Sequence, residues 1–215
     1  MPPADPLADP VAPRQLVGVT VWEEDVHDRT VDDVLSDWQF VDCDLKGVDL
    51  RGVTTRRVGF ANCDFTNADL AGTTHDASAF TNCRFPGANL ATAVFQSCKL
   101  TGSDLAAARM LAITIAGGDW SYVNLRGVDL AGRDLSEVGL AHADMDAAHL
   151  RGTILRGANL SHANLRAADL ATADLRGAVV DGATFDHADL TGCHIDLALA
   201  VALARARGAQ VDIAG

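Results

Sequence analysis

Residues 158–175 read ANLSHANLRAADLATADL, and the same five-residue pattern continues in both directions from this stretch. Its unit is a small residue, then Asn or Asp, then Leu, then two variable positions. From 40 to 195, 30 of the 32 positions divisible by five are apolar, the exceptions being Thr55 and His75. Neither the helical period of 3.6 nor the strand period of 2 fits a repeat of five. We therefore expect a chain that turns a corner every five residues.

Each unit is expected to form one side of a four-sided coil of twenty residues. The apolar central residue and the small residue two positions before it point inward, while Asp, Asn and Gly suit the corners. Stacking at about 4.8 Å makes a rod of about eight coils and roughly 38 Å. The sequence thus predicts an all-β solenoid with residues 36–195 in the repeat.

These residues resemble the pentapeptide-repeat family, whose repeat is A(D/N)LXX and whose fold is a right-handed quadrilateral parallel β-helix. Residues 42–45 (DCDL), 78–83 (SAFTNC) and 173–178 (ADLRGA) are similar to its quinolone-resistance members, the mycobacterial MfpA type and the plasmid-borne Qnr type. The resemblance implies that DNA gyrase, a type II topoisomerase, is the partner. It also implies that the protein inhibits or modulates gyrase, or protects it from fluoroquinolones, and it leaves the sign of the effect open.

Both ends of the chain depart from the repeat, as capping segments of a solenoid do. Residues 196–207 are rich in helix formers, with Asp196 placed as N-cap and Gly208 just after the last turn, so a short helix is expected. This segment is apolar nearly all round, so part of it must face another surface. The resemblance implies a tail-to-tail homodimer through the helix.

The expected segments are a disordered tail at 1–14, an N-terminal cap at 15–35, the repeat at 36–195, and the helix with its dimerisation segment at 196–215. The residues expected at the dimer interface are Leu197, Leu199, Val201 and Leu203.

Acidic residues dominate the charge and gather in columns of the repeat. A net charge of −12 gives no electrostatic source for direct nucleic-acid binding. Two adjacent columns hold the acids expected to bind a partner: Asp44, Asp64, Asp104 and Asp144 in the first, and Asp49, Asp69, Asp129, Asp169 and Asp189 in the second. Arg84 and Arg109 interrupt these columns, and Arg151 and Arg156 are expected on the opposite side of the rod.

Two interpretations of the acidic columns stay open. Corner-turn chemistry alone explains Asp at these positions. Alternatively, an acidic face imitates DNA for a protein that binds DNA. A function of a different class is an interaction scaffold, or an immunity factor against another topoisomerase poison, that acts without DNA mimicry.

No motif of an enzyme, a cofactor site or a metal site emerges. Cys43, Cys63 and Cys83 occupy small inward positions, where cysteine serves as a small hydrophobe. His142 and His162 are expected to stack on the outside with no third ligand, so they do not make a zinc site. His75 is expected to form a buried hydrogen-bonded pair with Thr55.

The expected setting is reducing and cytoplasmic, because five cysteines without short paired spacings do not make a disulfide scaffold and no signal peptide or apolar run of about 18 residues is present.

Residues 106–120 (AAARMLAITIAGGDW) keep the five-residue phase but break its composition. Ile113 is large where a small residue is expected; the other large residues at such positions along the repeat are Trp38 and Arg133. Gly118 precedes Trp120, whose indole is expected to take the space of a side chain at 118. The segment is interpreted as a distorted coil or as a surface for a partner.

Overall fold

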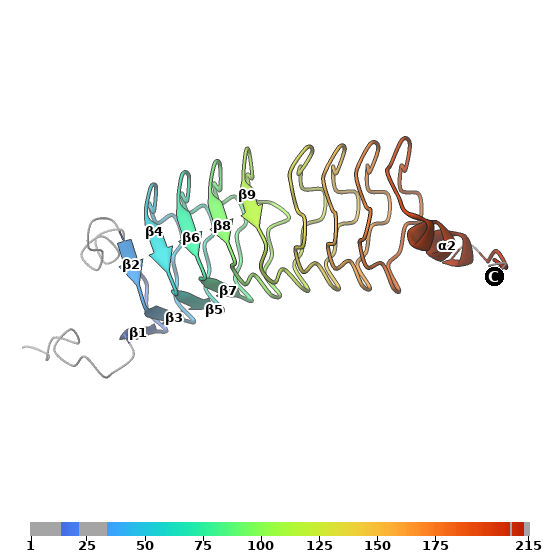
Figure 1. The fold of residues 1–215 in the computed structure, drawn as a ribbon. Helices are drawn as coiled ribbons and strands as arrows, with labels where there is room; N and C mark the ends of the chain where they lie inside the picture. The colour runs from blue at the N-terminus through green and yellow to red at the C-terminus, as the bar shows by residue number, and fades with distance from the viewer. Residues whose placement is uncertain (1–13, 22–33, 207, 213–215) are drawn as a thin grey trace, which may run out of the picture.

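The computed structural model describes residues 14–21, 34–206 and 208–212. Figure 1 shows a rod of stacked coils with a helix at its C-terminal end. The secondary-structure elements are β1 (Arg14–Val17), β2 (Val34–Ser36), β3 (Trp38–Val41), β4 (Thr54–Arg56), β5 (Gly59–Ala61), β6 (Thr74–Asp76), β7 (Ala79–Thr81), β8 (Val94–Gln96), β9 (Thr114–Ala116) and α2 (Leu197–Ala206).

From β2 onward neighbouring coils pair in parallel with a register of twenty residues, whereas β1 pairs with β3 at an offset of 24. Phe40 pairs with Phe60 and Phe60 with Phe80 in the sheet β1-β3-β5-β7, while the second sheet has the order β2-β4-β6-β8-β9. Beyond β9 single bridges continue the register, as between Asp174 and His194. The predicted fold, a parallel β-helix followed by a short helix, is confirmed.

The interior holds the predicted central residues. Every position divisible by five from Phe40 to Leu175 is buried, and Leu130, Leu150, Leu160 and Leu170 are fully enclosed. The prediction fails at the last coil, where Ile195 is 38% exposed. No further coil lies over this end, so the final central residues lose their cover.

Corner geometry explains why only part of the rod forms strands. From Leu125 to Leu190 each corner is closed by a backbone bond from residue i+3 to residue i, such as the Ala143 N–H to the Leu140 carbonyl (3.1 Å). The corners after Phe60 and Phe80 lack this bond, and three residues stay extended there. The number of strand-paired coils is therefore somewhat smaller than the predicted eight, because in the described residues paired strands are confined to 14–17 and 34–116 and later levels are held by single bridges.

The third residue of each corner adopts the left-handed conformation. Gly is common there, but residues such as Asn62 (φ +55°) and Thr172 (φ +60°) occupy it too. Among the described corners from Asp37 to Gly192, only Ala107 lies outside this region. That exception falls within the irregular segment.

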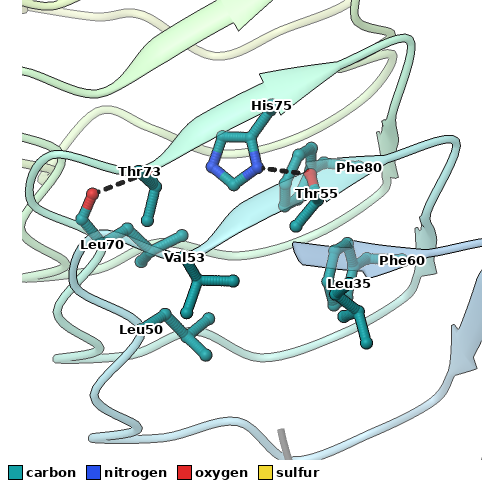
Figure 2. Close-up of a pocket in the computed structure, with 9 residues that line it drawn as sticks. All are labelled: Leu35, Leu50, Val53, Thr55, Phe60, Leu70, Thr73, His75 and Phe80. Carbon is teal, nitrogen blue, oxygen red and sulfur yellow. Dashed lines mark hydrogen bonds between the residues drawn. The ribbon is translucent and has the colours of Figure 1, made fainter. Parts of the chain in front are cut away.

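A polar cluster lies inside the first coils (Figure 2). The hydroxyl oxygen of Thr55 is 2.8 Å from Nδ1 of His75 and 2.9 Å from the hydroxyl oxygen of Ser78, which also accepts the N–H of Val58. The predicted Thr55–His75 pair is confirmed. Burial lowers the pKa of His75 to about 3. Nε2 of the same ring has no hydrogen-bond partner among the described residues, and the ring lines a cavity of about 10 Å³.

The ends differ from the middle as capping segments should. β1 pairs with β3, with Leu16 opposite Phe40, so Arg14 lies in a strand and not in the expected tail. β2 pairs with β4, so the register of twenty begins at Val34. Residues 1–13 of the expected tail and 22–33 of the expected cap lie outside the described residues.

The predicted helix is confirmed as α2. Its N-cap is Asp196, whose carboxylate accepts the N–H of Leu199 (2.9 Å) and that of Gly177 in the coil beneath (2.7 Å). Leu199 packs into the core of the chain and Leu203 packs partly against it. These contacts attach α2 to the last coil.

The irregular segment keeps its inward phase, since Met110, Ile115 and Trp120 are buried. Gly118 is required for a reason other than the one expected. A Cβ at this position would lie 2.1 Å from the carbonyl oxygen of Cys98, and φ is +95°. The three nearest atoms all belong to the backbone of Cys98 in the previous coil, closer than any atom of Trp120, so this backbone already excludes a side chain there.

Candidate partner-binding face

The two acidic columns lie on adjacent sides of the rod, on the residues that precede the buried central positions. Each carboxylate accepts the backbone N–H two residues later, as Asp44 does from Lys46 (3.0 Å) and Asp129 from Ala131 (2.9 Å). Asn124 and Asn164 accept the same bond, each at 3.2 Å. These side chains therefore stabilise corners, which supports the corner-turn interpretation.

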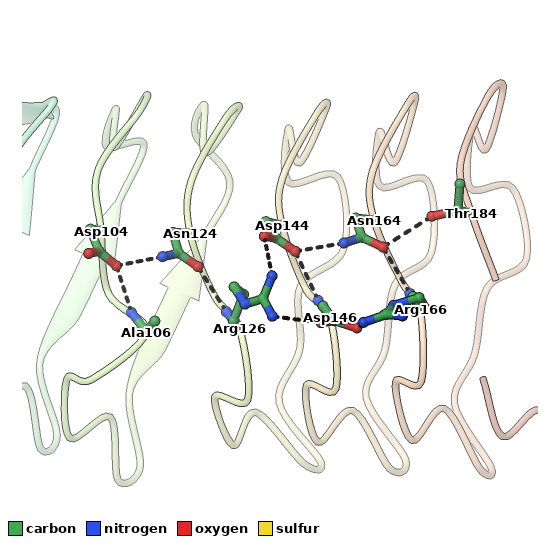
Figure 3. Close-up of polar contacts among 9 residues, drawn as sticks. All are labelled: Asp104, Ala106, Asn124, Arg126, Asp144, Asp146, Asn164, Arg166 and Thr184. Carbon is green, nitrogen blue, oxygen red and sulfur yellow. Dashed lines mark hydrogen bonds and ion pairs between the residues drawn. The ribbon is translucent and has the colours of Figure 1, made fainter. Parts of the chain in front are cut away.

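Side chains in one column also bond to each other along the rod (Figure 3). Asn124 donates to Asp104 (2.8 Å) and Asn164 donates to Asp144 (2.9 Å). Thr184 donates to Asn164 (3.1 Å). From Asp104 to Asn164 acids and amides alternate in this column, so like charges are not direct neighbours there, whereas Asp44 and Asp64 are direct neighbours at its start.

Basic side chains neutralise part of the face. Lys46 lies 3.1 Å from Asp44 and 3.6 Å from Asp64, and Arg51 lies 2.5 Å from Asp49 and 3.9 Å from Asp69. Such exposed pairs contribute little stability, roughly 0–1 kcal/mol each. Their effect here is to lower the local negative potential at this end of the rod.

The expected position of Arg151 was wrong. Its guanidinium lies 3.2 Å from the carboxylate of Asp169, an acid of the second column. Arg151 therefore lies beside the acidic face and not on the opposite side of the rod. Arg126 does the same at Asp144 (3.3 Å). Arg156 instead pairs with Asp174, which lies outside the two columns.

Three of the nine predicted acids have no basic side chain within 4 Å among the described residues: Asp104, Asp129 and Asp189. The hydroxyl and N–H of Thr191 hold the pKa of Asp189 below its usual range. This carboxylate is therefore ionised at neutral pH. These three acids carry the negative charge that the face offers to a partner.

The imidazoles of His142 and His162 stack on the outside as predicted, with centroids 4.8 Å apart. Tyr122, which the sequence analysis did not single out, extends the stack at 4.6 Å from His142. The stack follows from the register of twenty, so position 122 was available to the same reasoning. Among the described residues no group of three or more potential ligands is placed to hold a metal ion.

Cys43, Cys63 and Cys83 are buried free thiols, and Cys98 joins them. Burial raises the pKa of Cys98 to about 11, so this thiol is neutral at physiological pH. A neutral buried thiol fits the role of a small core residue.

The residues predicted for the dimer interface are divided by the structure. Leu197 is 77% exposed, whereas Leu199 is 2% exposed because it contacts its own coil. Val201 and Leu203 are partly buried. Leu197 lies with Val179 and Ile195 among the exposed large apolar side chains of the C-terminal end.

Comparisons with known proteins agree with this architecture. In the described residues no helix is long and apolar enough to cross a membrane. No curated protein sequence matched the chain. A trypsin-treated structure of QnrB1, described as a plasmid-mediated fluoroquinolone resistance protein, is 22% identical, with a TM-score of 0.74 over 93% of this chain and 98% of that one.

A second similar structure is HetL, described as a pentapeptide repeat protein involved in heterocyst differentiation regulation in the cyanobacterium Nostoc sp. strain PCC 7120. It is 23% identical, with a TM-score of 0.55 over 83% of this chain and 86% of that one. Both likenesses show the fold. The model of pentapeptide repeats matches residues 39–74, 77–110, 121–157 and 158–195, leaving 111–120 of the irregular segment unmatched, and the chain belongs to this family.

Proposed function

We propose that this chain binds DNA gyrase with its acidic face in place of DNA, and that it thereby modulates or inhibits gyrase and protects it from fluoroquinolones. The observation that carries the proposal is the likeness to QnrB1 over nearly the full length of both chains. The rod presents carboxylates at a fixed repeat, which suits a protein surface built to receive phosphates.

The charge of the rod should raise the rate of its association with gyrase more than the affinity of the complex. A net charge of −12 draws the rod toward a cationic surface at long range. Several acids of the face already pair with basic side chains of this chain, namely Lys46, Arg51, Arg126 and Arg151. A partner's basic groups would not compete with such internal pairs at Asp104, Asp129 and Asp189. Binding should therefore weaken with salt and compete with linear duplex DNA.

The sharpest test neutralises the face without disturbing its corners. Asn already accepts the corner bond at 124 and 164, so Asp→Asn at Asp64, Asp69, Asp104 and Asp129 removes charge and keeps the turn. Supercoiling by purified gyrase is measured with and without a fluoroquinolone. We expect the variant to lose at least tenfold in potency, both for inhibition and for protection.

A matched control carries Asp→Asn at Asp76, Asp119, Asp134 and Asp181, which lie outside the two columns. Both variants move the formal charge from −12 by four, to −8, so a difference between them reports position and not total charge. Equal potency of the two variants, with both folded, would refute DNA mimicry by this face.

The proposal includes a homodimer formed tail to tail by α2 and the last coil. This end of the rod has exposed apolar surface at Leu197, Ile195 and Val179. A two-fold symmetric contact would bury this surface on both copies of the chain. Leu199 supports such an interface from below by holding α2 on its coil. A particle of one chain's mass in light scattering at micromolar concentration would reject the dimer.

The alternative, an interaction scaffold or immunity factor that acts without DNA mimicry, is favoured by one specific observation. Bases interleave with acids along the face, as Arg126 and Arg166 do around Asp146 in Figure 3. A partner could read this mixed pattern by salt-bridge exchange. Gyrase that is unaffected by the unaltered protein would favour this function.

A further inference from the structure

The backbone ladder between coils is interrupted at one level. Elsewhere from Leu100 to Leu175 each central residue donates to the carbonyl 19 positions later, as Leu105 does to Asn124 and Trp120 to Gly139. Between residues 107–117 and the next coil, none of the expected bonds is made within the described chain. Bridges at the two sides that carry Arg109 and Thr114 are missing as well, although they resume one coil later.

The interruption covers two adjacent sides of the four. The N–H groups left without their expected partner belong to Ala107, Met110, Ala112, Ile115, Gly117, Asp129 and Asp134. Bonds at the other two sides hold the coils together. In Figure 1 the coil that contains β9 and the following coil stand visibly further apart than other neighbours. We call this opening the slit.

Overpacking accounts for the slit. The inward column of small residues runs Ala93, Ile113, Arg133 and Thr153, so its two largest members stack directly on each other. A small position filled by a large side chain strains a close-packed core and moves the backbone. Arg133 also carries a charge that cannot be buried without a partner. Separation of the two coils on this side relieves both problems.

The slit is a lined groove and not only a space between backbones. A hollow of about 450 Å³ is bounded by Arg109, Met110 and Leu111 on one lip and by Val128, Asp129 and Arg133 on the other. Leu111 is 74% exposed at its rim. Arg109 and Arg133 have no ion-pair partner among the described residues, and they outnumber Asp129, the one acidic residue of the lining, so the groove has a local excess of positive charge.

We propose that the slit binds an extended acidic peptide segment of a partner protein, which adds as a strand between the two coils. Backbone N–H and C=O groups on both lips lack hydrogen-bond partners in the neighbouring coil. An extended peptide can pair with them, whereas a helix cannot, because its own backbone groups are already bonded to each other. Apolar side chains of the segment would contact Met110, Leu111 and Val128. Carboxylates would pair with Arg109 and Arg133.

This site is distinct from the proposed gyrase function, since it needs no DNA-binding partner, and it shares only Asp129 with the acidic columns. The bound peptide should resemble the sequence of one side of a coil, in which a small residue, an acidic residue and leucine follow one another. We therefore choose as probe a labelled peptide, Ala-Asp-Leu-Ala-Thr-Ala-Asp-Leu, which copies residues 168–175. The matched control peptide has Lys in place of both Asp.

The experiment combines fluorescence anisotropy with amide hydrogen exchange by NMR on the full chain. We expect the acidic probe to bind at least tenfold more tightly than the basic one. We also expect fast exchange at Met110, Ala112 and Asp129 in the free protein and slower exchange with the acidic probe. Slow exchange without the probe, or no binding at about 1 mM, would overturn the proposal.

Two variants separate the slit from the rest of the surface. Ile113→Ala with Arg133→Thr copies the residues found one coil before and one coil after, and should close the slit. It is expected to slow exchange at Met110 and Ala112 at least tenfold and to weaken probe binding at least tenfold. Undiminished binding to this variant would place the peptide elsewhere and overturn the proposal.

The second variant, Arg109→Glu with Arg133→Glu, keeps a large side chain at 133 and should leave the slit open. Preference is expected to reverse toward the basic probe, with exchange unchanged, and an unaltered preference would refute the charge assignment. Concentration-dependent self-association of the unaltered chain that vanishes when the slit is closed would assign the slit to a second copy, against the proposal.

Discussion

His75 should make the free energy of unfolding depend on pH between about 5 and 7.5, which a leucine at the same inward position would not do. Burial lowers its pKa to about 3, against about 6.5 for an exposed imidazole. Below pH 6.5 the unfolded chain takes up a proton that the folded chain refuses, so acid favours unfolding. The free energy of unfolding should fall by about 1.4 kcal/mol per pH unit, hence by about 2 kcal/mol between pH 7.5 and 5.0.

The assay is urea unfolding followed by circular dichroism at pH 7.5, 6.0 and 5.0, for the unaltered chain and for His75→Leu. Leucine stands elsewhere in the same column, at Leu35 and Leu135, and Thr55 keeps its bond to Ser78 in the variant. Other titrating groups act equally on both proteins, so the difference isolates His75. Parallel losses of stability in the two proteins would refute the reasoning.

Three further predictions concern packing and assembly. Leu150→Asp should destabilise the fold by more than about 4 kcal/mol, because it places an unpaired carboxylate among buried leucines, and thermal melting will measure it. Gly118→Ala should lower stability by roughly 1–3 kcal/mol more than Gly117→Ala, since a Cβ at 117 meets nothing within 4 Å while one at 118 meets backbone; equal losses would argue against this contact. Leu197→Glu should yield monomers in light scattering with a smaller fall in melting temperature than Leu199→Glu, which also detaches α2 from its coil, and a dimer that survives Leu197→Glu would move the interface elsewhere.

Much of the architecture could be predicted because a period of five leaves few geometries open. Phase alone places Leu150 or Phe80 inside, and a register of twenty follows from four sides. Even the buried pair of Thr55 and His75 could be predicted, since two polar exceptions fall one coil apart in the same column. Ile195 shows the limit of such reasoning, because phase does not say where the covering coils stop.

The face was harder to predict than the core. A column analysis places Asp169 and Arg151 on different columns, yet a long flexible arginine crosses that distance and pairs with the acid. Likewise, Ile113 and Arg133 are each noticeable as large residues, but their combined effect on the ladder depends on how two coils accommodate volume together. Side-chain reach and collective packing are properties of the folded rod that no single position encodes.

The slit also gives the rod a mechanical character. Two stiff segments are joined along two walls only, so bending stiffness drops at one level and in one direction. Flexing that narrows the slit breaks no backbone bond, whereas flexing the opposite way strains the bonded walls at Leu105 and Trp120. A rod with this asymmetry can follow a curved partner surface by tilting at a single level, while each half keeps its own spacing of side chains.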